Sequence, residues 1–113
     1  MIKIATLPSY FHPVKVEFPT DDGKKKTVEF QAQFKRLSQE EIEEQQQALN
    51  DGTLTDRGVI GQVMIGWKGV ADEDGTPLDF NESNLASLLS MFPTQPSIVR
   101  AYYDSLKNAA KKI

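Results

Sequence analysis

The fold depends on one stretch, VMIGWKGVADEDGTPLDF, which runs from Val63 to Phe80 and contains the only tryptophan of the chain. Its apolar beginning predicts the last turns of a helix that ends near Trp67, and Gly69 offers the left-handed residue that commonly follows a helix. The acidic segment 72–75 predicts a tight turn, in which the glycine is free to take a positive φ. We therefore expect two helices joined by an ordered loop, with a large aromatic residue of the core at each end.

The helix expected before this loop has Thr55 as its cap. Its apolar residues recur at the spacing of one helix face, and they are Val59, Ile60, Val63, Met64 and Trp67. Each of its glycines weakens the helix by about 1 kcal/mol relative to alanine, and they are Gly58, Gly61 and Gly66. The helix should therefore depend on packing, and close approach of another backbone would explain the glycines.

Two further helices are expected after the loop. Asn81 caps the first, which runs to about Met91 and places Leu85, Leu88, Leu89 and Phe92 on one face. The last helix begins at Pro96 or Ser97 and runs towards Ile113, because proline is well suited to a first helical turn. Its apolar stripe consists of Ile98, Tyr102, Leu106, Ala109 and Ile113. Tyr102 and Tyr103 are neighbours about 100° apart, so we expect at most one to be fully buried.

The first third of the chain predicts β-structure. Residues 1–12 are expected to form an irregular lead-in, and alternating apolar and polar residues predict an antiparallel hairpin over residues 13–35. One face of its second strand is apolar and consists of Val28, Phe30, Ala32 and Phe34. The other face is polar. The helices must therefore cover the apolar face, because an isolated hairpin is only marginally stable.

A capping box marks the start of another helix, with Ser38 as the cap and Glu41 three residues later. This helix should run to about Leu49. Its start is rich in glutamate, which suits the positive end of a helix, and its apolar stripe is thin. We therefore expect it to lie on the outside of the molecule.

Taken together, the 113 residues predict a single α+β domain over residues 1–113, with a hairpin packed against about four helices in a helical part that covers residues 38–113. The residues expected in its core are Trp67, Phe80, Phe30, Phe34, Leu85 and Leu88. The chain has no cysteine, which excludes disulfides and thiolate chemistry. It also has no apolar run of the length that a membrane helix needs, and a cytosolic protein is the plain interpretation.

The charges are unevenly distributed. Residues 38–92 carry two Lys or Arg against eleven Asp or Glu, although the net charge of the chain is only −3. An acidic middle argues against nucleic acid as the main partner, because phosphate binding needs a concentrated basic face. The only basic run, residues 24–26, follows two aspartates and is typical of a solvated hairpin turn.

No residue pattern predicts catalysis or a metal site. His12 is the only histidine and has no second ligand or nucleophile near it in the sequence, so we expect a surface histidine. The acidic turn does not fit a calcium-binding EF-hand, because taking Gly75 as the sixth position places Val70 first and Asn81 twelfth. We therefore expect no enzymatic activity, no metal and no cofactor.

The combination of Gly66-Trp67-Lys68-Gly69-Val70, Asp74-Gly75-Thr76-Pro77-Leu78 and Phe80 resembles the tail assembly chaperones of long-tailed bacteriophages and prophages. The resemblance extends from Pro8 to Lys112. It implies a non-enzymatic protein of the host cytoplasm that binds the tape measure protein, keeps it soluble and helps recruit tail-tube subunits. It also implies absence from the mature virion and, in many such phages, a longer frameshifted product that shares this domain.

A chaperone for a long helical protein needs adaptable apolar surface, together with charge that keeps the complex in solution. The candidate contact residues are Tyr103, Met91, Phe92 and Met64, because methionine and aromatic side chains suit varied partners. Each could instead be part of the core. We also expect weak self-association, and we expect neither nucleic acid nor a membrane as a partner. The alternative function is an acidic adaptor or inhibitor, a nucleic-acid mimic or antitoxin-like protein, that binds a basic partner.

Overall fold

The computed structural model describes residues 8–111, with side chains described up to Lys107. Within these residues the chain forms three strands and four helices, in the order β1 (Ser9–Pro19), β2 (Lys25–Lys35), α1 (Gln39–Asp51), α2 (Asp56–Val63), β3 (Met64–Lys68), α3 (Glu82–Leu89) and α4 (Thr94–Lys111). This arrangement confirms the predicted α+β class and the predicted hairpin.

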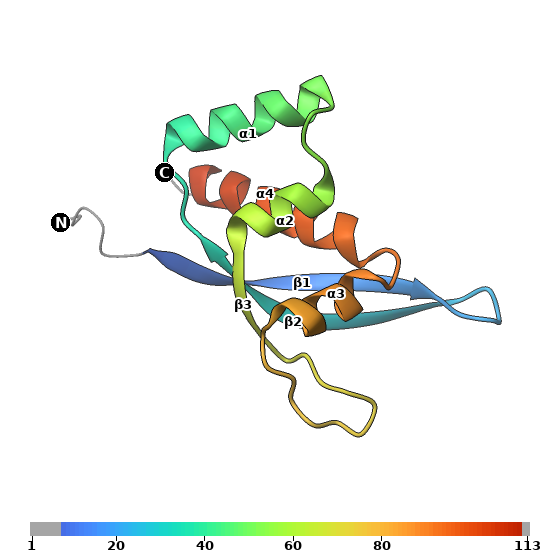
Figure 1. The fold of residues 1–113 in the computed structure, drawn as a ribbon. Helices are drawn as coiled ribbons and strands as arrows, with labels where there is room; N and C mark the ends of the chain where they lie inside the picture. Colours follow the sequence, from blue (N-terminus) through green and yellow to red (C-terminus); the bar gives the residue numbers. More distant parts are fainter. Residues whose placement is uncertain (1–7, 112–113) are drawn as a thin grey trace.

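The three strands form one antiparallel sheet in the order β1-β2-β3. The β1–β2 pairing is continuous from Ser9 opposite Lys35 to Pro19 opposite Lys25. β3 pairs only with residues 31–34 of β2, so the outer half of the hairpin has two strands. Figure 1 shows this half extending beyond the helices.

The core lies between one face of the sheet and the helices. α4 packs on β1, and both α2 and α3 pack on α4. Phe34 is fully buried at its centre, with its ring edge-to-face against Tyr102 at a centroid distance of 5.2 Å and against Tyr10 at 5.9 Å. As expected, only Tyr102 of the two neighbouring tyrosines is fully buried, and Tyr103 is half-buried.

The predicted capping box at the start of α1 is confirmed, because the Ser38 hydroxyl accepts from the Glu41 N–H and the Glu41 carboxylate accepts from the Ser38 N–H. Gly52 closes the helix with a φ of +77°. The only buried side chain of α1 is Gln45. Figure 1 shows α1 as the outermost helix, above α2 and α4, as its thin apolar stripe predicts.

The prediction that Met64 to Trp67 continue a helix is wrong. α2 ends at Val63, and the next residues form β3. The register between β2 and β3 shifts between Gln33 and Phe34, so Met64 lies opposite Phe34 and Trp67 lies opposite Ala32. This bulge places Met64 and Trp67 on the same face, although they are three residues apart.

The expected close approach of another backbone to Gly58, Gly61 and Gly66 is not found. A Cβ at Gly66 would lie 2.4 Å from the Gln33 side chain on β2, and a Cβ at Gly58 would lie 2.6 Å from Leu54. The close neighbours are therefore side chains and not a backbone. Gly69 has the expected positive φ of +86°, but it follows a strand and not a helix.

Three boundaries also differ from the sequence-based prediction. β1 begins at Ser9, so residues 9–12 are strand and only residues 1–7 of the expected lead-in lie outside the described part. α3 ends at Leu89, before Met91. α4 begins at Thr94, two residues before Pro96. Ala109 and Ile113 of the expected stripe lie outside the described side chains.

Trp67 organises the loop between β3 and α3. Its ring packs edge-to-face on Phe80 at a centroid distance of 5.0 Å. Its Nε1–H donates to the Leu78 carbonyl at 2.8 Å. Both rings are half-buried and pack against the hydrophobic core. Of the other residues expected in the core, Phe30, Phe34 and Leu85 are buried and Leu88 is half-buried.

Candidate protein-binding surfaces

Two exposed large apolar side chains lie next to each other in the turn between α3 and α4, and one of them, Phe92, is the most exposed of its kind among the described residues. Phe92 is 80% exposed and Met91 is 47% exposed. The turn itself is ordered by backbone hydrogen bonds, because the Met91 N–H donates to the Leu88 carbonyl and the Thr94 N–H donates to the Met91 carbonyl. The turn thus holds the two side chains out towards solvent, which is where a partner could cover them. We call Met91 and Phe92 the apolar turn.

The exposure of Phe92 overturns its expected place on the apolar face of α3. The helix ends at Leu89, and the chain turns before Phe92 could continue the stripe. Leu85 and Leu89 alone are buried on this helix, and Leu88 is half-buried.

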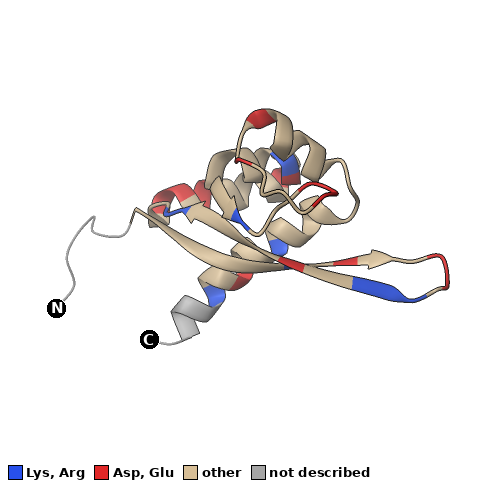
Figure 2. Cartoon of the chain, turned by 90° about the horizontal axis from the view of Figure 1, so that it is seen from below, with Lys and Arg blue, Asp and Glu red and all other residues tan. Residues whose placement is uncertain are grey.

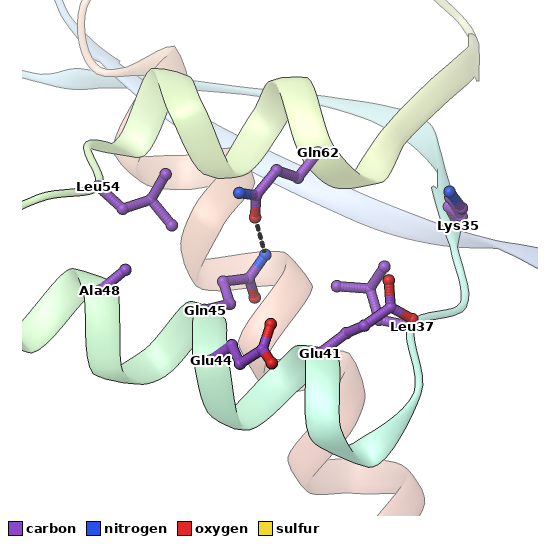
Figure 3. Close-up of a pocket in the computed structure, with 8 residues that line it drawn as sticks. All are labelled: Lys35, Leu37, Glu41, Glu44, Gln45, Ala48, Leu54 and Gln62. Atoms are coloured by element: carbon purple, nitrogen blue, oxygen red, sulfur yellow. Dashed lines mark hydrogen bonds between the residues drawn. The ribbon is translucent and has the colours of Figure 1, made fainter.

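Tyr103, another candidate contact residue, ties three helices together. Its hydroxyl donates to the Gln45 Oε1 of α1 at 2.7 Å, and the Gln45 side-chain amide donates to the Gln62 Oε1 of α2 at 2.8 Å. Figure 3 shows the bond between the two glutamines spanning the space between α1 and α2. Burial raises the pKa of Tyr103, and the Asp56 carboxylate adds to the shift. The hydroxyl is therefore the neutral donor that this network needs.

A cleft of about 340 Å³ lies between α1 and α2, around this network. Its walls combine aliphatic and charged side chains, namely Lys35, Leu37, Glu41, Glu44, Gln45, Ala48, Leu54 and Gln62. Polar contacts of Gln45 thus connect α1 to α2 and α4, and half-buried apolar residues supplement them.

Met64, the fourth candidate, lies in the core. It is 5% exposed and lies opposite Phe34 in the sheet. A buried side chain cannot contact a partner without rearrangement, so Met64 does not belong to the surface formed by the apolar turn.

A larger groove of about 800 Å³ is lined by residues of β1, β2 and α4. His12 lies in it, and burial lowers the pKa of this histidine against a smaller opposing effect of Asp104. The groove also contains Lys15, Glu17 and Arg100. The groove is therefore lined by both positively and negatively charged side chains.

The titratable groups are not arranged as a metal site. In the part of the chain that the structure describes, no three His, Asp or Glu side chains lie close enough to hold a metal ion. Asp72, in the acidic turn, instead accepts hydrogen bonds from the N–H groups of Asp74 and Thr76 through one carboxylate oxygen. This carboxylate orders the loop backbone.

Comparison with known proteins bears on the resemblance seen in the sequence. A family model described as "Phage tail assembly chaperone" matches residues 1–112. Comparison with curated proteins and with solved structures gave no match. None of the helices among residues 8–111 is long and apolar enough to cross a membrane. Because the family model covers nearly the whole chain, the chain belongs to the phage tail assembly chaperone family.

Proposed function

We propose that the chain binds the phage tape measure protein, keeps it soluble, and helps recruit tail-tube subunits, the last through a longer frameshifted form. Its family supports a chaperone role in tail assembly and suggests a non-enzymatic one. The observation that carries the proposal is the apolar turn, with Phe92 80% exposed and Met91 47% exposed on an ordered turn.

The chemistry of the apolar turn suits such a partner. A long helical protein presents apolar stripes, and an exposed phenyl ring can enter the grooves of such a stripe. The flexible methionine beside it can adapt to partner residues of different shapes. The half-buried ring of Tyr103 is a second candidate contact, although its hydroxyl is already bonded to Gln45.

The acidic helix α1 supplies the other property that the role needs. Glu40, Glu41, Glu43 and Glu44 are all exposed at its first turns. Negative charge on the outermost helix would keep a complex of several copies in solution. One small domain covers little of a very long partner, so we expect many copies on each tape measure protein, with weak contacts between them. The complex would form in the host cytoplasm and would be absent from the mature virion.

Co-expression with the tape measure protein of the same phage tests this function. The tape measure protein should be insoluble alone and soluble with the wild-type chain, in a complex of many copies to one. Phe92→Ser should lower the soluble yield, whereas Phe11→Ser should not, because Phe11, which is 41% exposed, lies on β1 and not in the apolar turn. A tape measure protein that stays insoluble with the wild-type chain would contradict the proposal.

The distribution of charge does not favour the alternative of an acidic nucleic-acid mimic. Such a mimic needs carboxylates along one exposed face at phosphate-like spacing. Figure 2 shows Asp and Glu on several separate elements, including the hairpin tip, with Lys and Arg between them. Lys25 even pairs with Glu17 on the hairpin at 3.3 Å.

A further inference from the structure

β1 is an edge strand with a long unpaired side. Among residues 8–111 it pairs with β2 alone, on one side. At the two ends of this pairing, the Arg36 N–H donates to the Pro8 carbonyl and the Thr20 N–H donates to the Lys24 carbonyl. Because the register is continuous, these two bonds show which residues of β1 are hydrogen-bonded to β2. The even-numbered residues bond to β2, and the odd-numbered residues direct their N–H and C=O groups to the free edge.

The prolines of β1 agree with this assignment. Pro13 and Pro19 are both odd-numbered, so neither interrupts the bonds to β2. Between them, Lys15 and Glu17 present the free N–H groups of this segment, and no hydrogen bond among residues 8–111 uses either. Both side chains are exposed. The free edge between the prolines therefore offers two donors and their neighbouring carbonyl groups.

This segment is complementary to itself. We propose that two copies of the chain associate through antiparallel pairing of their β1 edges, with Lys15 of each copy opposite Glu17 of the other. The pairing joins the two sheets into one, and it gives the weak self-association proposed above a defined surface.

The register follows from three features of the strand. With Val16 of one copy opposite Val16 of the other, Lys15 and Glu17 form two hydrogen-bonded pairs, which gives four backbone hydrogen bonds. The same register places opposite charges directly across from each other on the exposed face. Pro13 of each copy then lies opposite Pro19 of the other. Because proline has no N–H, the ladder of backbone hydrogen bonds ends at these residues.

Neighbouring registers are disfavoured by charge. Sliding one strand by two residues keeps the odd-numbered residues facing each other. It places Lys15 opposite Lys15 in one direction and Glu17 opposite Glu17 in the other. Like charges directly across a sheet are destabilising. Each of these registers also places a proline opposite Lys15 or Glu17. The proline has no N–H, so a backbone hydrogen bond between the two copies is lost. One register alone satisfies both the charges and the backbone.

The surroundings of β1 leave room for a second strand. A groove of about 800 Å³ lies along Pro13, Lys15, Glu17 and Pro19, and Arg100 and Asp104 of α4 also line it. A contact of four backbone bonds and two ion pairs is small, so the association should be weak. Edge prolines are a common means of preventing extended strand pairing, and here they would limit it to one short ladder.

Charge reversal tests the pairing in the purified chain alone. Lys15→Glu and Glu17→Lys should each weaken self-association at least about tenfold, measured by sedimentation equilibrium up to millimolar concentration, because each creates two like-charge contacts between the copies. Glu17→Lys also removes the ion pair with Lys25 of the same hairpin, so its melting temperature is compared with that of the wild type. An equimolar mixture of the two variants should associate as the wild type does, because opposite charges then meet at both pairs. Lys107→Glu and Glu73→Lys make the same charge changes on exposed residues outside β1 and should have no effect.

Amide exchange gives a second measurement. Exchange of the Lys15 and Glu17 N–H groups should slow as the concentration rises, whereas the Phe11 N–H, which also faces the free edge but lies beyond Pro13, should not change. A wild-type chain that stays monomeric, or a mixture of the two variants that fails to associate, would overturn the proposal. Since no tape measure protein is present, that result would leave the chaperone function standing.

Discussion

Replacing Trp67 with alanine should destabilise the whole domain, because this residue joins the sheet to the loop before α3. The half-buried indole removes roughly 100 Å² of apolar surface from water, which is worth about 2.5 kcal/mol at about 25 cal/mol per Å². The edge-to-face contact with Phe80 and the Nε1–H bond to Leu78 each add about 1 kcal/mol. Water that enters the space left by the indole offsets part of these contributions. We therefore expect the free energy of unfolding to fall by about 3–4 kcal/mol.

Urea unfolding followed by far-UV circular dichroism measures this loss, since the variant has no tryptophan to report fluorescence. The melting temperature should fall by about 10–15 °C. Trp67→Phe keeps a ring against Phe80 but removes the N–H donor, and it should cost about 1–2 kcal/mol. Ile65→Ala is a control on the same strand, because Ile65 is 47% exposed at the bulge and should cost well under 1 kcal/mol. A Trp67→Ala chain that melts within about two degrees of the wild type would refute the reasoning.

Three further predictions concern α1 and the acidic loop. Tyr103→Phe leaves the Gln45 Oε1 without its donor, so it should cost about 1–2 kcal/mol and speed amide exchange in α1. The hydrogen bonds from Ser38 lower the pKa of Glu41. Stabilisation by Glu41 is therefore present above its ordinary pKa of 4.5, and it should be lost as the pH falls through the lower value of the folded state. Glu41→Gln should accordingly reduce the acid dependence of unfolding, measured by denaturation at several pH values. Calcium, magnesium or zinc at millimolar concentration should not shift the melting temperature, because Asp72 already accepts backbone hydrogen bonds; a shift of several degrees would contradict this.

Local signals in the sequence predicted the parts of the fold that depend on neighbouring residues. Ser38, Thr55 and Asn81 each accept from an N–H in the first turn of the helix they precede, as their residue types predict. The alternation around Phe30 and Phe34 predicted their shared buried face, because period-two patterning follows directly from strand geometry. These contacts span only a few residues.

The sequence was misleading where distant pairing decides the structure. A bulge at Ile65 places Met64 and Trp67 on one face at a spacing of three, which is also the spacing of a helix face. Only pairing with β2, about thirty residues earlier, distinguishes the two. The position of Phe92 is a similar case, because helical spacing predicts it on the face of Leu85 and cannot show that α3 ends at Leu89.

The sequence predicted candidate contact residues from their residue types alone. Methionine and aromatic side chains indicate adaptable contacts, but the sequence alone could not separate buried Met64 from exposed Met91. Their exposure depends on packing against elements that are remote in the chain. Tyr103 lies between the two cases, because its ring is half-buried and its hydroxyl bonds to Gln45, 58 residues away.

The most direct test of the proposed function is the affinity of the purified chain for an amphipathic helical segment of the tape measure protein, measured by calorimetric titration. The combined variant Met91→Ser/Phe92→Ser should bind at least about tenfold more weakly than the wild type, with an unchanged melting temperature, because both side chains are exposed before binding. Phe11→Ser should bind as the wild type does. Equal affinity of the wild type and the combined variant would contradict the assignment of the apolar turn as the contact surface.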